Sequence, residues 1–175
     1  HGKHVLVEKP ATVNSREFDE MCALAKERGL FLMEAMWTAF LPAIIRAKQW
    51  VDAGMIGKVT AVQADLGFAL DLTPERRNIN PALAAGTLLD LMIYPLTFGR
   101  IFSNSTVKEY QIMAEKHYSG ADSADMIQLL YDNGVLGQFS ASSCERYHND
   151  GIIIGTKGRI VIKDFHMSKE AVMIS

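Results

Sequence analysis

The apolar positions in residues 1–38 predict a strand, a helix and a second strand. Residues 4–7 (HVLV) and 30–37 (LFLMEAMW) are short apolar runs, which are typical of buried strands. Between them, residues 15–28 (SREFDEMCALAKER) repeat their apolar side chains at helical spacing, and Asn14 or Ser15 can cap this helix. Strands that are joined by such a helix run parallel, so we expect a βαβ unit.

The middle of the chain predicts two further helices, with a strand and a long loop between them. Residues 41–53 (LPAIIRAKQWVDA) have helical spacing, and residues 58–68 (KVTAVQADLGF) alternate between apolar and polar side chains as a strand does. Residues 69–85 contain prolines and charged side chains, which indicates a loop of the length that often carries function. A third helix is expected from residues 86–87 onward.

After residue 105 the pattern changes to successive strands, expected over 106–116, 124–131, 135–145, 151–154 and 159–163. Asn133-Gly134 is a strong hairpin signal, and GIIIGTKGRIVI (151–162) predicts a second hairpin. The polar segment CERYHND (144–150) is expected to be a surface turn. The sequence therefore predicts an α+β fold with an open, mostly antiparallel C-terminal sheet that carries helices on one face and leaves the other for a partner.

The composition mainly excludes classes of function. The 175 residues carry 18 Lys plus Arg against 20 Asp plus Glu, and the dispersed charges form no basic stripe for nucleic acid or an anionic membrane. The longest apolar runs fall short of the roughly 20 residues that cross a bilayer. Cys22 and Cys144 make no disulfide framework, which favours a cytoplasmic protein. The five histidines lack metal-ligand spacing, so no metal is expected.

The third predicted helix, AAGTLLDLMIYPLTFGRIF (84–102), combines an apolar surface with two polar side chains. Asp90 and Tyr94 are four residues apart and share a face. Pro95 lacks an N–H group, so a kink is expected beside this pair. A core tyrosine bonded to a structural aspartate explains the residues as well as a reactive pair does.

Residues Glu8, Lys9 and Pro10 follow the first predicted strand directly. A lysine at the carboxyl end of a parallel strand lies where open α/β sheets bind ligands. A lysine whose ammonium group simply reaches solvent from a strand end is the commoner case, and taken alone this interpretation is favoured.

Together, these segments resemble the Gfo/Idh/MocA family of nicotinamide-dependent oxidoreductases. The similarity is closest to the dihydrodiol and sugar dehydrogenase branch, and it covers nearly the whole chain. It rests on VLVEKPATVN, RGLFLMEAMWTAFLPA, the spacing of Asp90 and Tyr94 in LLDLMIYPL, and GTKGRIVI.

The resemblance implies two domains. Residues 1–38 would be the C-terminal remnant of a dinucleotide-binding Rossmann domain, and residues 39–175 a substrate-binding and dimerisation domain truncated at its C-terminus. Glu8, Lys9 and Pro10 would contact NAD or NADP. The family's glycine-rich G-x-G-x-x-G loop is absent, and the chain starts with His-Gly rather than Met, so we expect a fragment without activity of its own.

The resemblance also implies roles for site residues. Lys9, Asp90 and Tyr94 would be catalytic, with Tyr94 where most members have histidine. Trp37 would line the substrate pocket, and Arg77 and Asp90 would bind the substrate, a sugar or diol. A homodimer is expected through the open sheet face.

The implied chemistry is consistent with the residue types. Hydride removal from a carbinol carbon requires a base for the hydroxyl proton, and the reverse reaction requires an acid. A phenol ordinarily has a pKa of about 10, and a neighbouring ammonium group favours the phenolate. Lys9 and Tyr94 would form such a pair. Because a carboxylate beside a phenol opposes its ionisation, Asp90 is expected to orient Lys9 or the substrate.

Two positions depart from the family pattern. Ala84-Ala85-Gly86 replaces a run of three glycines, and Met92 stands where glycine is usual, which could narrow the pocket. The alternative function is a non-catalytic one, namely a substrate-binding or dimerisation module, or a regulatory member of the family that binds no cofactor.

Overall fold

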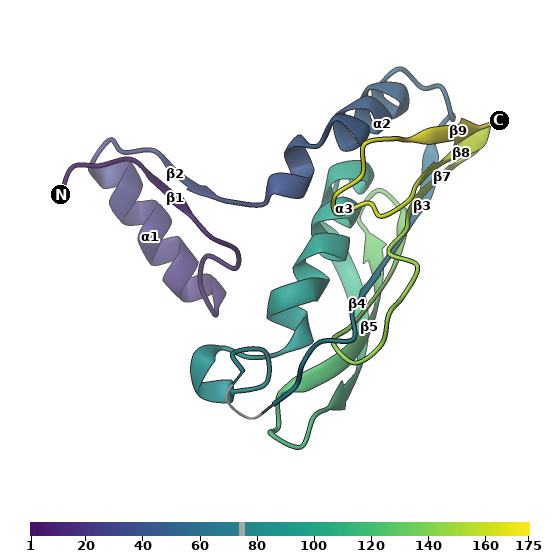
Figure 1. The fold of residues 1–175 in the computed structure, drawn as a ribbon. Coiled ribbons are helices and arrows are strands. Elements are labelled where there is room, and N and C mark those ends of the chain that lie inside the picture. Colours follow the sequence, from purple (N-terminus) through teal and green to yellow (C-terminus); the bar gives the residue numbers. More distant parts are fainter. Residues whose placement is uncertain (74–75) are drawn as a thin grey trace. The chain divides into compact units, whose positions relative to one another are not determined.

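A computed structural model describes residues 1–73 and 76–175 of the chain. The chain divides into two compact units, His1–Trp37 and Thr38–Ser175, and each is described by itself (Figure 1). The loop expected over 69–85 includes residues 74 and 75, which lie outside the described residues.

The first unit is the predicted βαβ arrangement (Figure 1). Strands β1 (Val5–Val7) and β2 (Leu32–Glu34) are parallel, and helix α1 (Ser15–Glu27) connects them. The prediction that residues 4–7 form a buried strand was wrong about burial, since Val5 is 45% and Leu6 65% exposed. The reason is that β1 pairs with β2 alone in this two-stranded sheet.

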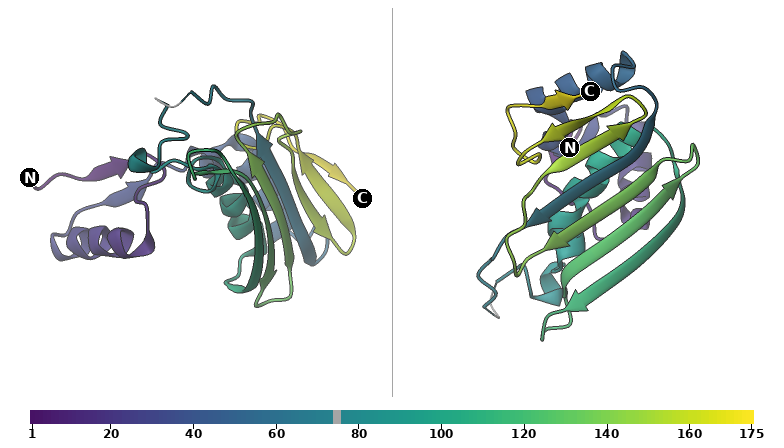
Figure 2. Two further views of the ribbon diagram at one scale, coloured as in Figure 1. Left: turned by 90° about the horizontal axis from the view of Figure 1, so that it is seen from below. Right: turned by 90° about the vertical axis from the view of Figure 1, so that its right-hand side faces the viewer.

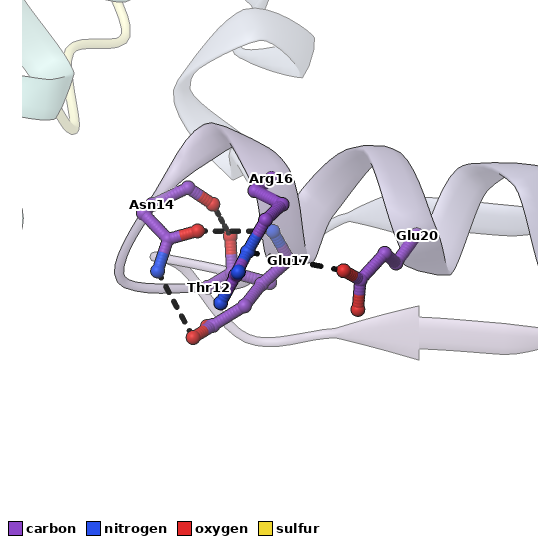
Figure 3. Close-up of polar contacts among 5 residues, drawn as sticks. All are labelled: Thr12, Asn14, Arg16, Glu17 and Glu20. Atoms are coloured by element: carbon purple, nitrogen blue, oxygen red, sulfur yellow. Dashed lines mark hydrogen bonds and ion pairs between the residues drawn. The ribbon is translucent and has the colours of Figure 1, made fainter.

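Helix α1 begins with a reciprocal cap, which Figure 3 shows. Asn14 Oδ1 accepts a hydrogen bond of 3.0 Å from the Glu17 N–H, and Asn14 Nδ2 donates one of 2.9 Å to the Glu17 carboxylate. Thr12 Oγ1 donates to the Asn14 carbonyl, and Arg16 and Glu20 pair one turn apart on the helix surface. Of the two capping residues that the sequence allowed, the structure therefore uses the asparagine.

The second unit is a seven-stranded sheet in the order β4-β5-β6-β3-β7-β8-β9. Only β3 and β6 are parallel, so the predicted mostly antiparallel sheet is confirmed. The strands are β3 (Val59–Gly67), β4 (Val107–Lys116), β5 (Asp122–Tyr131), β6 (Leu136–Ser142), β7 (Gly151–Gly155), β8 (Gly158–Ile162) and β9 (Val172–Ile174). Strand β9 was not predicted, and it is only three residues long.

Helices lie along one face of this sheet, and the other face is open (Figure 2). Helix η1 (Trp37–Phe40) is a short 3₁₀ turn that leads into α2 (Pro42–Asp52), which has proline in its first turn. Helix α3 (Ile93–Ser103) packs on β3, β6 and β7. The core lies between α3 and the sheet, and its largest fully buried side chains include Phe98, Phe102, Phe139 and Phe165.

The helical stretch Pro81–Ser103 is long and apolar enough to cross a membrane, by length and composition alone. It is made of the 3₁₀ turn η2 (Pro81–Leu83), the π-helical turn η3 (Leu88–Met92) and α3. Because Phe98 and Phe102 in α3 are buried against the sheet, packing in the protein core accounts for its apolar composition.

The helix is irregular just before Pro95, as the missing N–H group of proline predicts. Instead of a regular α-helix before the proline, residues 88–92 form a wide π-helical turn with Asp90 at its centre. Such turns are rare and occur often at functional sites. The irregularity expected beside Asp90 and Tyr94 is therefore present as a widened turn.

The segment predicted as a surface turn at 144–150 is only partly at the surface. Asn149 is 5% exposed and adopts a positive φ of 64°. Its Oδ1 accepts from the Gly67 N–H at 2.8 Å, and its N–H donates to Asp65 Oδ1 at 2.6 Å. The segment therefore fastens the end of β3, which its polar composition did not reveal.

Candidate functional site

The first group of predicted site residues lies at the carboxyl ends of β1 and β2. Glu8 is exposed, whereas Lys9 and Pro10 are half-buried, and the Lys9–Pro10 peptide bond is cis. The Lys9 N–H donates to the Glu8 carboxylate at 3.1 Å. Glu34, the last residue of β2, accepts from the Ala11 N–H at 2.8 Å, which ties the segment after β1 to β2.

These residue types fit one end of a nicotinamide nucleotide. The end of a parallel sheet is where such nucleotides bind, and Lys9 supplies an ammonium donor there while Glu8 supplies acceptor oxygens for ribose hydroxyl groups. Within residues 1–73 and 76–175, no group of three or more His, Cys, Asp or Glu side chains could hold a metal ion.

The second group is centred on Asp90, in the π-helical turn. Its carboxylate accepts a hydrogen bond from Arg77 Nη2 at 2.8 Å and another from Asn78 Nδ2 at 3.1 Å. The Asp90 side chain is 15% exposed and that of Arg77 is 50% exposed. The structure thus brings together Arg77 and Asp90, which the family resemblance placed in one site, and adds Asn78.

Tyr94 lies one turn beyond Asp90 and is 8% exposed. Its ring meets the His166 ring edge to face, with centroids 6.4 Å apart, and Phe68 packs on the same histidine at 5.5 Å. The Nδ1 atom of His166 is buried without a hydrogen-bond partner among the described residues. Burial lowers the pKa of His166, partly offset by Asp164, so a neutral imidazole lies against the phenol ring.

The predicted residues fall into both units. Lys9 and Trp37 belong to the first, and Trp37 is 41% exposed at the start of η1. Asp90 and Tyr94 belong to the second. That Lys9 meets Tyr94 stays a prediction.

Sequence reasoning missed two residues of this site. Asn78 had a usable signal, because it directly follows Arg77 and an amide is a good second donor for a carboxylate. His166 had none, since it reaches Tyr94 through the packing of a distant loop onto α3.

Family comparisons cover both units. The GFO/IDH/MocA C-terminal domain matches residues 44–161, and the oxidoreductase family domain with an NAD-binding Rossmann fold matches residues 1–36.

The chain is also similar to several curated proteins named trans-1,2-dihydrobenzene-1,2-diol dehydrogenase. The pig protein (Sus scrofa) is 37% identical over 164 residues, covering 93% of this chain and 48% of the relative. The human protein is 36% identical over 160 residues, covering 91% and 47%. The chain therefore spans about half the length of the curated relatives it matches.

Solved structures share the fold. An aldose-aldose oxidoreductase from Caulobacter crescentus, complexed with glycerol, superimposes with a TM-score of 0.91 at 26% identity over 98% of this chain and 52% of that one. KijD10, a 3-ketoreductase from Actinomadura kijaniata in complex with NADP and TDP-benzene, gives a TM-score of 0.87 at 22% identity over 99% and 58%.

Proposed function

Because this chain belongs to the Gfo/Idh/MocA oxidoreductase family, we propose that the protein containing it is an NAD- or NADP-dependent dehydrogenase. It transfers a hydride between nicotinamide and the carbinol or carbonyl carbon of a sugar or diol. The names of its relatives, which include a diol dehydrogenase and an aldose oxidoreductase, support this substrate class.

The observation that carries the proposal is the placement of Asp90 and Tyr94 on consecutive turns of one irregular helix, within a chain that matches both domains of the family. Tyr94 is buried on α3, away from bulk water, as an acid–base group near a reacting oxygen should be. Glu8, Lys9 and Pro10 would hold the ribose end of the nucleotide.

In this mechanism the nicotinamide group, when bound, supplies or accepts the hydride. The phenol of Tyr94 takes the hydroxyl proton during oxidation and returns it during reduction. Lys9 favours the phenolate electrostatically and hydrogen-bonds the reacting oxygen. Each of these proton-handling roles is of the kind worth about 10²–10⁴-fold in rate.

The contacts of Asp90 remove a difficulty with this mechanism. An uncompensated carboxylate next to Tyr94 would oppose formation of the phenolate. Arg77 offsets that negative charge at 2.8 Å, and Asn78 fixes the second carboxylate oxygen. The charge of Asp90 would therefore oppose the phenolate only weakly. Asp90 can then orient a substrate hydroxyl group, with Arg77 beside it. Trp37 would form a wall of the pocket.

The open face of the sheet supports a homodimer. Met113 and Met126 are directly paired on neighbouring strands and are 69% and 55% exposed. Gln63 and Gln138 continue this face and hydrogen-bond one another at 3.1 Å. Exposed apolar groups that gather on one surface are typical of protein interfaces. Substituting Met126→Lys should shift the sedimentation coefficient from dimer to monomer.

The second candidate function is a substrate-binding, dimerisation or regulatory module without catalysis. It is favoured by Met92, which is fully buried at a position where the family pattern usually has glycine. In that case the protein should bind a sugar or diol without turnover.

The test is steady-state kinetics on the longer protein with its cofactor. Lys9→Met and Tyr94→Phe should each lower kcat by about 10²-fold or more, since each removes a proton-handling group. Lys108→Met and Tyr118→Phe are matched controls, because both side chains are exposed on the sheet unit. Unchanged kcat in both site variants would overturn the assignment, and turnover of no diol or sugar at all would favour the non-catalytic module.

A further inference from the structure

Two acidic side chains on β5 are brought to one face of the sheet by a bulge. Alternation along a strand would place Asp122 and Asp125, three residues apart, on opposite faces. The register with β4 shifts here, because Lys116 pairs with Asp122 whereas its neighbour Glu115 pairs with Ala124. One extra residue in the strand reverses the alternation, so both aspartates point the same way.

The two aspartates are in direct contact. Asp125 is 3% exposed, and its Oδ2 has no hydrogen-bond partner among the described residues. The side chain of Asp122 lies within hydrogen-bonding reach of the Asp125 carboxyl group. Carboxylate oxygens only accept hydrogen bonds. A hydrogen bond between two carboxyl groups therefore requires that one of them keeps its proton.

Asp122 also holds the start of the helix that carries Asp90 and Tyr94. Its Oδ2 accepts from the Leu88 N–H at 2.6 Å. Gly86 has a φ of +126°, and a Cβ atom there would lie 2.2 Å from Asp122 Oδ1. The approach of the carboxyl group to this turn is therefore possible only with glycine at position 86.

Buried hydroxyl groups complete the junction between the helix and the sheet. Thr87 Oγ1 lies 3.0 Å from both the Ser123 carbonyl and Ser143 Oγ, and can donate to either. Ser143 Oγ also donates to the Ser123 carbonyl, at 3.1 Å. The bulged residue, Ser123, thus joins the helix start to the end of β6.

We propose that Asp122 and Asp125 share a single proton, and that this pair positions the first turn of the helix that presents Asp90 and Tyr94. Both are positioning residues, since they act through the helix. The consequence for catalysis rests on the function proposed above, whereas the shared proton and the held helix turn do not.

The surroundings of Asp125 oppose its ionisation. Burial, followed by the charge of Asp122, raises the pKa of Asp125 to about 7. In the loop after β6, the pKa of Tyr147 is raised by burial, then by the charges of Glu145, Asp65 and Asp125, so Tyr147 lies within electrostatic range of Asp125. Lys116, opposite Asp122 on β4, is the one cation paired with it in the sheet register of the described residues.

The pair should therefore lose its proton as the pH rises through neutrality. The two negative charges would then repel each other, and Asp122 would release or shift the Leu88 N–H. The turn that precedes Asp90 would loosen without any change in the residues that contact substrate.

The first experiment needs no activity. Carboxyl ¹³C shifts of the chain should show one group of the Asp122–Asp125 pair titrating near neutrality. The exchange protection of the Leu88 amide, corrected for its intrinsic pH dependence, should fall about tenfold across that titration, as loss of one hydrogen bond to a charged group predicts.

Variants make this test specific. Asp122→Ala should remove the Leu88 protection at every pH. Asp125→Asn should keep the Leu88 protection even at high pH. The reason is that the asparagine amide donates a hydrogen bond at every pH, in place of the shared proton. Asp132→Asn, in the exposed turn that follows β5, should behave as the wild type. Two carboxyl groups that both ionise below pH 5, or protection of Leu88 that is the same in Asp122→Ala, would overturn the proposal.

The second experiment uses the longer enzyme. Asp122→Ala should lower kcat with a smaller change in KM, and Asp125→Asn should shift the alkaline limb of the kcat profile to higher pH. If the nuclear magnetic resonance results hold while both kinetic profiles match the wild type, the positioning role is wrong. If no dehydrogenase activity is found, the proposed function fails, and the shared proton is still decided by the first experiment.

Discussion

The ion pair between Arg77 and Asp90 can be tested as a structural unit before any substrate is known. Arg77→Met removes the guanidinium group and keeps an apolar stem of similar reach. Asp90→Asn removes the negative charge and keeps the shape. The double variant completes a cycle that isolates the interaction between the two side chains.

The expected magnitude follows from burial and distance. A hydrogen bond to a charged group is worth about 1.5–3 kcal/mol, and fully exposed ion pairs are worth about 0.2–1 kcal/mol. Asp90 is only 15% exposed, whereas Arg77 is 50% exposed, so solvent screens one partner. We expect a coupling energy of about 1 kcal/mol, at the upper end of the range for exposed pairs. Asn78 still serves the carboxylate when Arg77 is replaced, which keeps the value from rising higher.

The assay is urea unfolding at neutral pH, with the slope of the free energy against urea required to stay constant across the variants. The chain supplies its own control in Arg76 and Asp71, which pair at 3.0 Å with side chains 60% and 55% exposed. That cycle should give less than about 0.5 kcal/mol. A coupling energy for Arg77 and Asp90 no larger than the control's would refute the view that the site is held by this pair.

Three further variants test the fold around the site. Asn149→Ala should cost about 2–3 kcal/mol, because it leaves the Gly67 N–H unpaired and places alanine at a positive φ. Gly99→Ala should destabilise by about 1 kcal/mol, since its Cβ would lie 2.4 Å from the Phe139 ring and overpacking outweighs the gain in helix propensity. Burial lowers the folded-state pKa of His166, so as the pH falls through about 6.5 the unfolded chain takes up a proton on this residue and the folded chain does not. The wild type should therefore lose stability between pH 7 and 5, and His166→Phe should lose less. Each is measured by urea unfolding, the last as a function of pH.

Each of these three predictions has an outcome that would contradict it. Asn104 also has a positive φ but is exposed, so Asn104→Ala should cost less than Asn149→Ala, and equal losses would discount the Gly67 hydrogen bond. A more stable Gly99→Ala variant would mean that α3 has room to move from the sheet. An unchanged pH slope in His166→Phe would mean that this histidine is protonated in the folded chain.

Local patterns predicted most of the fold. Helical spacing located α1 within a residue at each end, and the Asn133-Gly134 dipeptide located the hairpin between β5 and β6. These features depend on neighbours in sequence, so the sequence contains their cause. For the site, the spacing of Asp90 and Tyr94 predicted a shared helix, and the family resemblance added Arg77, which the structure places 2.8 Å from Asp90.

The features that were missed depend on residues far apart in the chain. The burial of Asn149 follows from its bond to the end of β3, and the exposure of β1 from the lack of a second neighbouring strand in its sheet. The contact between Asp122 and Asp125 was hidden for a different reason. Strict alternation assigns them to opposite faces, and only the register with β4 reveals the extra residue that reverses one of them.

The helix that contains the widened turn at residues 88–92 has side-chain contacts at both of its ends. A proline and a π-helical turn weaken the regular backbone hydrogen bonds in the middle of the helix. At its start, Asp122 and Thr87 connect it to β5, and at its end the Ser103 carbonyl accepts from Asn133 Nδ2 at 2.8 Å. The turn that precedes Asp90 is therefore held by Asp122 and Thr87, Asp90 itself by Arg77 and Asn78, and Tyr94 by the packing of α3 on the sheet.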